Sequence, residues 1–132
     1  MLGKFGRGVA VLWLGAVLGG CAAAAAGAAG AAAGIYFTSR GVGGVIEGSL
    51  DDVVRRTEIV YRDMGITIRE REVDPDGDEI EIKGNRGGMS VDTNIRRETA
   101  TTSRIEVEAQ KSAVEWDQDY ARDVLNRIIQ QR

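Results

Sequence analysis

The fold is decided by Met89-Ser90-Val91-Asp92-Thr93-Asn94-Ile95-Arg96, where Met, Val, Thr and Ile alternate with Ser, Asp, Asn and Arg. A period of two with one apolar face predicts a strand in an antiparallel sheet covered on one side. The same alternation recurs at 66–73, 79–83 and 103–110. Turn-forming or polar residues separate the runs at 74–78, 84–88 and 97–101. Together the runs predict a four-stranded antiparallel meander.

Amphipathic helices are predicted before and after the meander. The first begins after Ser49, a suitable N-cap with Asp52 three residues on, and ends at Gly65. Its apolar face would carry Leu50, Val53, Val54, Thr57, Tyr61 and Met64. The apolar face of the second would carry Trp116, Tyr120, Ala121, Val124, Leu125, Ile128 and Ile129. The predicted ion pairs on their outer sides are Asp51–Arg55, Asp52–Arg56, Glu58–Arg62 and Asp123–Arg127.

A weak extra strand is predicted at 42–47, where Gly43 and Gly44 interrupt the β-branched residues. Both helices must bury an apolar stripe, and the sheet has one apolar face to receive them. The predicted fold is therefore an α+β two-layer domain over 35–132, with two helices packed on one face of the four-stranded meander.

The N-terminal segment resembles a bacterial lipoprotein export signal. Lys4 and Arg7 precede an uncharged run at 9–18, and Leu18-Gly19-Gly20-Cys21 matches the pattern of a lipobox. A run of this length fits a signal peptide and is too short to span a bilayer. The segment predicts a cleaved signal peptide at 1–20 and lipidation of Cys21, the chain's only cysteine, which excludes an intramolecular disulfide.

Two alternatives for this segment remain open. Alanines at 22–24 offer a second cleavage site that would release a soluble domain, and an uncleaved stretch at 8–39 would form a membrane-spanning helix. All three place the folded domain outside the cytoplasm, because the cations favour the inner side. In the lipoproteins that this segment resembles, the residue after the cysteine influences sorting, and Ala22 at that position implies the outer membrane, on the periplasmic side, if the cell is Gram-negative. The Ala/Gly stretch at 21–34 is predicted to be a tether, with helix packing by its small residues as the alternative.

The charge of the chain argues against nucleic-acid binding. The full chain has 17 basic and 20 acidic residues, and removal of Lys4 and Arg7 would leave 15 against 20. Nucleic-acid recognition requires a cationic surface, commonly with aromatic rings for stacking.

Residues that could carry catalysis are scarce. The chain has no histidine, its cysteine is assigned to the lipid, and no catalytic or phosphate-binding motif is present. Asp74, Asp76 and Asp78 are the one metal-like cluster, but the EF-hand pattern requires Gly where Glu79 stands. They are predicted to form a polar turn, with a calcium site as the alternative. No cofactor is predicted.

The polar face of the predicted sheet is a solvated surface or a docking surface for an envelope partner. Its residues would be Arg69, Arg71, Glu79, Glu81, Lys83, Asp92, Asn94, Arg96, Arg104, Glu106 and Glu108. Trp116 is predicted to anchor the last helix in the core.

The signal ending in Cys21, the Ala/Gly tether and the Ser49-Leu50-Asp51-Asp52-Val53 helix start, followed by the meander, resemble a family of small bacterial lipoproteins catalogued only as a domain of unknown function. The resemblance implies an envelope location and an α+β fold, and carries over no catalytic residue.

The predicted function is a membrane-anchored, non-enzymatic binding or structural module with an envelope protein partner. The alternatives are a calcium-responsive adhesion or sensing module built on Asp74–Asp78, and a hydrolase that uses carboxylates alone and requires two acids facing each other in a pocket.

Overall fold

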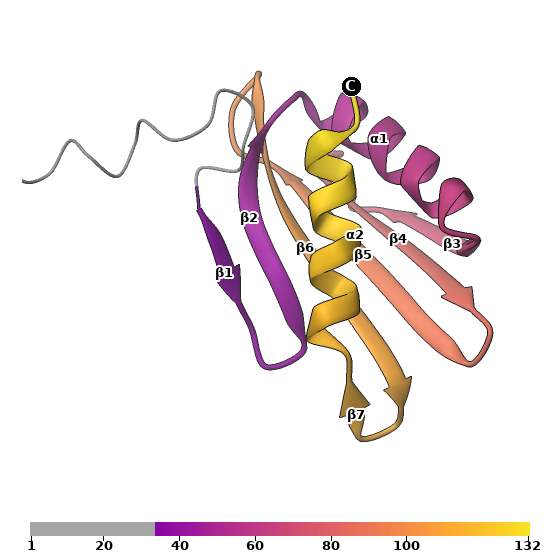
Figure 1. Ribbon diagram of the computed structural model, residues 1–132. Helices are drawn as coiled ribbons and strands as arrows, with labels where there is room; N and C mark the ends of the chain where they lie inside the picture. Colours follow the sequence, from indigo (N-terminus) through magenta and orange to yellow (C-terminus); the bar gives the residue numbers. More distant parts are fainter. Residues whose placement is uncertain (1–33) are drawn as a thin grey trace, which may run out of the picture.

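The computed structural model describes residues 34–132, which form one sheet and two helices (Figure 1). The predicted signal peptide, Cys21 and nearly all of the predicted tether lie outside the described residues. The elements in chain order are β1 (Ile35–Phe37), β2 (Gly41–Glu47), α1 (Leu50–Asp63), β3 (Thr67–Val73), β4 (Glu79–Arg86), β5 (Met89–Arg97), β6 (Thr102–Ser112), β7 (Glu115–Trp116) and α2 (Gln118–Gln130).

The sheet is antiparallel, and its strand order is β1-β2-β6-β5-β4-β3, with β7 paired to β6. The α+β class and the meander over β3–β6 are confirmed. The predicted strand number is wrong, because the sheet has seven strands. The segment predicted as a weak strand is β2, which pairs with β6 along its whole length.

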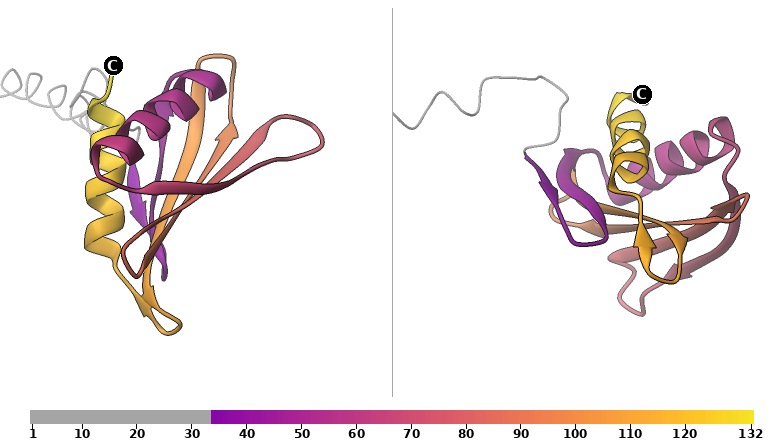
Figure 2. Two further views of the ribbon diagram at one scale, coloured as in Figure 1. Left: turned by 90° about the vertical axis from the view of Figure 1, so that its right-hand side faces the viewer. Right: turned by 60° about the horizontal axis from the view of Figure 1, so that its bottom comes forward.

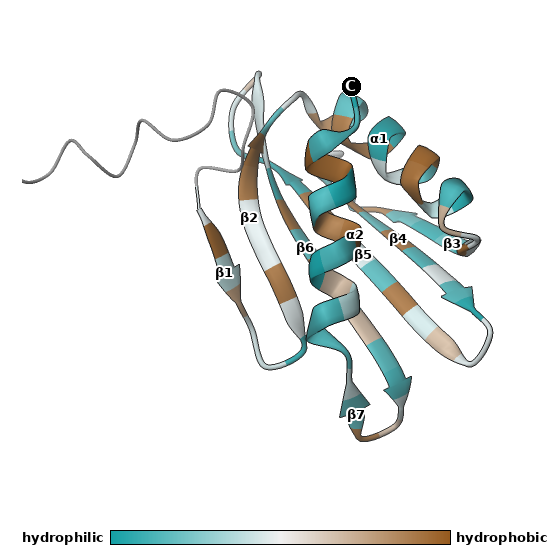
Figure 3. Ribbon diagram, viewed as in Figure 1, coloured by the Kyte–Doolittle hydropathy of each residue, from teal (hydrophilic) through white to brown (hydrophobic). Residues whose placement is uncertain are grey.

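Both helices lie on the same face of the sheet and leave the other face uncovered (Figure 2). Hydrophobic bands alternate with hydrophilic ones along the strands and helices, as the sequence pattern requires (Figure 3). The core between the layers is built from Val, Ile and Leu side chains with less than one tenth of their surface exposed, together with Tyr61. The buried rows of the central strands come from Ile80 and Ile82, Val91 and Ile95, and Ile105 and Val107.

Tyr61 connects α1 to the centre of the sheet. Its hydroxyl lies 2.7 Å from the hydroxyl of Thr93 and donates toward the backbone oxygens of Ile82 and Val91, at 3.3 and 3.2 Å. Burial raises the pKa of this phenol. The ring edge lies against Gly84, where an added Cβ would come within 3.1 Å of Tyr61 Cε2 and 2.7 Å of Ile66 Cγ2.

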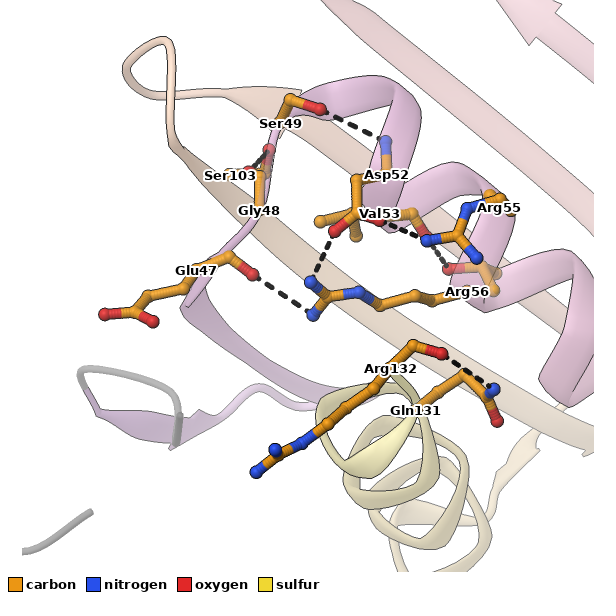
Figure 4. A network of polar contacts seen from close by, with 11 residues as sticks. Glu47, Gly48, Ser49, Asp52, Val53, Arg55, Arg56, Ser103, Gln131 and Arg132 are labelled. Carbon is orange, nitrogen blue, oxygen red and sulfur yellow. Dashed lines mark hydrogen bonds and ion pairs between the residues drawn. The ribbon is translucent and has the colours of Figure 1, made fainter. Parts of the chain in front are cut away.

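A polar network fixes the start of α1 (Figure 4). The predicted N-cap is confirmed, since Ser49 Oγ accepts from the backbone N–H of Asp52 at 3.3 Å. Arg56 pairs with the Asp52 carboxylate and donates to the backbone oxygen of Glu47 at 3.1 Å. Ser103 of β6 donates to the backbone oxygen of Gly48 at 3.0 Å, which ties the β2–α1 junction to the sheet.

Two of the four predicted helix ion pairs form, and in the other two one residue pairs with a different partner. Asp52–Arg56 is present, and Asp123–Arg127 is present at 3.2 Å. Arg55 pairs with Asp52 instead of Asp51, at 2.5 Å. Glu58 pairs with Arg71 of β3 at 2.8 Å instead of with Arg62, because a tertiary partner lies within its reach.

Trp116 does not anchor α2 in the core, contrary to the prediction. It lies in β7, opposite Gln110 of β6, and the helix begins after the Asp117 N-cap. Its ring is partly exposed, with the guanidinium of Arg40 at 5.3 Å from the ring centre. The helical spacing of apolar residues extends back to Trp116, but the helix itself begins only at Gln118 and Trp116 belongs to the strand before it.

Candidate functional site

The uncovered face of the sheet is the candidate functional site, and its residues lie in cross-strand rows. In one row Glu81 of β4 faces Asn94 of β5, which faces Glu106 of β6. In the next row Lys83 faces Asp92, which faces Glu108. Strand alternation places these side chains opposite the buried rows, so every one of them is directed away from the helices.

Most of the predicted polar face is confirmed, but Arg71 lies on the helix side. A β-bulge between Ile68 and Glu70 shifts the register of β3 against β4. The extra residue reverses the alternation, so Glu70 and Glu72 join the uncovered face beside Lys83, and Arg71 turns toward Glu58. Arg69 stays with the uncovered face, where its Nε donates to the side-chain oxygen of Asn85 at 2.9 Å.

Three cations of this face pair with carboxylates of neighbouring residues. Arg96 pairs with Glu79 at 2.7 Å, and Arg104 pairs with Glu98 at 2.5 Å. Lys83 lies 3.4 Å from Glu72, 3.5 Å from Glu81 and 3.9 Å from Glu70. Hydrogen bonds from Asn94 and Arg96 lower the pKa of Glu79.

The face also carries a shallow hollow of about 320 Å³, which we call the acidic hollow. Its lining residues are Glu79, Glu81, Asp92, Asn94, Arg96, Glu106 and Glu108. Within residues 34–132, Asp92, Glu106 and Glu108 have no cationic side chain within 4.0 Å. None of these three carboxylates therefore forms an ion pair in the described domain, although the charge of Lys83 acts on Asp92 and the charge of Arg40 acts on Glu108, each lowering the pKa against the effect of burial.

Two carboxyl groups of the hollow are shifted toward the protonated form. Burial raises the pKa of Asp92, and the charge of Glu81 adds to this effect. Burial also raises the pKa of Glu108, and the charge of Glu106 adds to it. Partial desolvation beside like charges disfavours the ionised form. A cation that entered the hollow would favour the ionised form of both carboxyl groups and so oppose the rise in their pKa values.

The aspartates at 74–78 form the β3–β4 turn. Asp74 accepts from the backbone N–H groups of Asp78 and Glu79 at 3.0 and 3.2 Å, and Asp78 pairs with Arg97 at 3.1 Å. In the part of the chain that the structure describes, no group of three or more metal-ligating side chains is gathered in a geometry that could hold a metal ion. The turn prediction is confirmed by these backbone bonds.

The predicted boundary of the β4–β5 turn is corrected. Gly84, Asn85 and Arg86 belong to β4, and the turn is made by Gly87 and Gly88. A second hollow beside it, of about 480 Å³, is lined by residues of β3, β4 and β5 that include Glu70, Lys83 and Asp92. It adjoins the acidic hollow at Asp92.

Within residues 34–132, none of the helices combines the length and the apolar composition that crossing a membrane requires. A comparison of the chain with protein-family models finds no match, and a comparison with curated proteins finds none either.

Proposed function

We propose that this protein is a membrane-anchored envelope lipoprotein whose folded domain docks a partner on its uncovered sheet face. The anchor would be Cys21, and residues 22–34 would be the tether. The observation that carries the docking part is the set of three carboxylates, Asp92, Glu106 and Glu108, which line the acidic hollow and form no ion pair in the described domain.

Charge complementarity favours a partner segment that presents Lys or Arg side chains. Complementary potentials guide encounter and orientation more than they add affinity. The paired strands fix the backbone beneath these carboxylates, so no backbone ordering is required on binding. Association through this face should therefore weaken as the salt concentration rises.

The docking proposal is tested with an oligolysine peptide added to the full-length lipidated protein in detergent micelles. Amide resonances of β5 and β6 should shift with oligolysine, and oligoglutamate should leave them unchanged. The Glu106→Gln/Glu108→Gln variant should lose the shifts. The matched control is Glu70→Gln/Glu72→Gln, which removes two carboxylates that each form an ion pair with Lys83. Equal shifts in both variants would contradict the proposal.

The anchoring proposal is tested separately by metabolic labelling with palmitate. The wild-type protein should incorporate label, and Cys21→Ser should incorporate none and accumulate as the unprocessed precursor. A Ser49→Ala variant in the folded domain should be labelled like the wild type. Labelling of Cys21→Ser would refute the anchor.

A carboxylate hydrolase is a second candidate, favoured by the pairing of Asp92 with Glu108. Directly opposed residues on neighbouring strands have Cβ atoms about 5 Å apart, and retaining glycosidases hold their carboxyl groups at about that separation. The acidic hollow is open along the sheet face, which suits docking better than enclosure of a sugar ring. Release of reducing ends from bacterial glycan that is lost in Asp92→Asn would support the hydrolase instead.

A further inference from the structure

We propose that strand β1 lies in the membrane interface, with Ile35, Tyr36 and Phe37 in contact with the headgroup and upper acyl region of the bilayer. The proposal rests on the lipid anchor of the proposed function. It adds an orientation, in which one edge of the sheet faces the lipid and the uncovered face remains accessible to a partner.

The first observation is an exposed run of large apolar side chains on an edge strand. Ile35, Tyr36 and Phe37 are 43%, 37% and 58% exposed, and β1 is the last strand at its end of the sheet. Pairing with β2 places Tyr36 opposite Gly43 and Phe37 opposite Val42. Because neighbouring residues of a strand point to opposite faces, this run is apolar on both sides.

Exposed apolar side chains alone do not select this edge, because the opposite edge strand, β3, also carries two, although four charged residues at 69–72 lie between them. On β3, Ile68 is 41% exposed and Val73 is 56% exposed. The two edges differ in where the chain enters the domain. In the sequence, the Ala/Gly stretch of residues 22–34 directly precedes β1. β3 is separated from β1 by four strands of the sheet.

The length of the connecting chain sets how close β1 stays to the anchor. The 14 residue steps from Cys21 to Ile35 span at most about 50 Å when fully extended. A chain of that length has an end-to-end distance of about 20 Å as a flexible coil and about 21 Å as a helix. β1 is therefore held near the surface of the bilayer, which raises its effective concentration there.

The side-chain chemistry also fits an interface. Aromatic rings with a polar end favour the headgroup level, and apolar side chains penetrate the boundary below it. Tyr36 supplies a partly exposed phenol whose ring lies over Gly43, and Phe37 and Ile35 supply apolar surface. Arg40 in the next turn stacks on Trp116 at 5.3 Å. The proposed contact between β1 and the bilayer is mainly apolar. It should therefore persist in zwitterionic lipid and at high salt.

The test places a fluorescent reporter on each edge of the sheet. The lipidated full-length protein, in a Trp116→Phe background, carries either Phe37→Trp or the control Val73→Trp, two positions of nearly equal exposure. The proteins are reconstituted into phosphatidylcholine vesicles whose acyl chains are brominated. We expect quenching of the Phe37→Trp reporter to exceed that of Val73→Trp by about threefold, because the interface reaches ~5–10 Å into the lipid boundary.

Equal quenching of the two reporters, or quenching of neither, would overturn the proposal. Flotation of the same vesicles separates this failure from failure of the anchor. A protein that floats with the vesicles while Phe37→Trp stays unquenched keeps its anchor and loses the β1 contact. A protein that does not float contradicts both proposals.

Discussion

Asp92 of β5 lies directly opposite Glu108 of β6 on the uncovered face, and the pKa of each carboxyl is raised, first by burial and then by a neighbouring carboxylate. Like charges that face each other across two strands destabilise a sheet. The pair therefore costs stability at neutral pH, which is consistent with a surface built for a cation.

The first prediction concerns stability at neutral pH. At pH 7, Asp92→Asn/Glu108→Gln should raise the free energy of unfolding by about 0.5 kcal/mol, because it removes opposed like charges. Glu79→Gln is the control and should change stability in the opposite direction, because Glu79 is hydrogen-bonded by Asn94 and Arg96. Urea unfolding measures both. A loss of stability in the double variant would contradict the prediction.

The second prediction concerns the pH dependence of the same pair. A carboxyl whose pKa is raised by folding favours the native state when it is protonated, so its contribution is present at low pH and is lost as pH rises through the raised value. The ordinary values are 3.8 for Asp92 and 4.5 for Glu108. The stability gap between the variant and the wild type should therefore narrow as pH falls from 7 toward this range. A difference in stability between variant and wild type that does not change with pH would contradict the raised pKa values of Asp92 and Glu108.

The third prediction concerns the buried hydroxyl of Tyr61. Tyr61→Phe leaves the Thr93 hydroxyl without its 2.7 Å partner, and should cost about 1–3 kcal/mol. Tyr61→Phe/Thr93→Val should recover part of this loss, because both polar groups are then gone. Tyr120→Phe is the matched control, since its hydroxyl contacts Arg86 only at 3.5 Å. Equal unfolding midpoints for the two single variants would refute the role given to Tyr61.

The fourth prediction concerns the space at Gly84. Gly84→Ala would bring the new Cβ within 2.7 Å of Ile66 Cγ2 and 3.0 Å of the Thr67 backbone oxygen. Overpacking of this kind should cost about 1–3 kcal/mol. Gly88→Ala, with no atom within 4 Å of its added Cβ, should leave stability nearly unchanged. Thermal unfolding of the two variants at the same midpoint would show that Gly84 is not required for packing.

The fifth prediction concerns calcium. Asp74 is engaged by two backbone N–H groups, and Asp78 is paired with Arg97. We expect the same melting temperature in calcium and in chelator. An increase in calcium that Asp76→Asn abolishes would support a metal site at this turn.

The meander and both helices could be predicted because their apolar residues recur with a clear period of two in the strands and at helical spacing in the helices. The helix that begins after Ser49 and the strands with a period of two are both observed where the pattern predicts them. The strand β2 was harder to predict, because Gly43 and Gly44 leave few side chains from which a period can be recognised. β1 and β7 have only three and two residues, and are stabilised by pairing with their neighbours.

The uncovered face could be predicted except where the backbone is irregular. The bulge after Ile68 reversed the expected side of Arg71, and no residue in that run marks the bulge. The charge pattern predicted a mixed face, but only the cross-strand register shows that Asp92, Glu106 and Glu108 lie together without an ion pair while Arg96 and Arg104 pair with other carboxylates. Register is a long-range property, so the acidic hollow could not be derived from local sequence.

The most direct measurement is the intact mass of the mature protein isolated from its native membrane. The account predicts a chain that begins at Cys21 and carries a diacylglyceryl group on its sulfur. A polypeptide that retains residues 1–20, or that bears an unmodified thiol at Cys21, would contradict it.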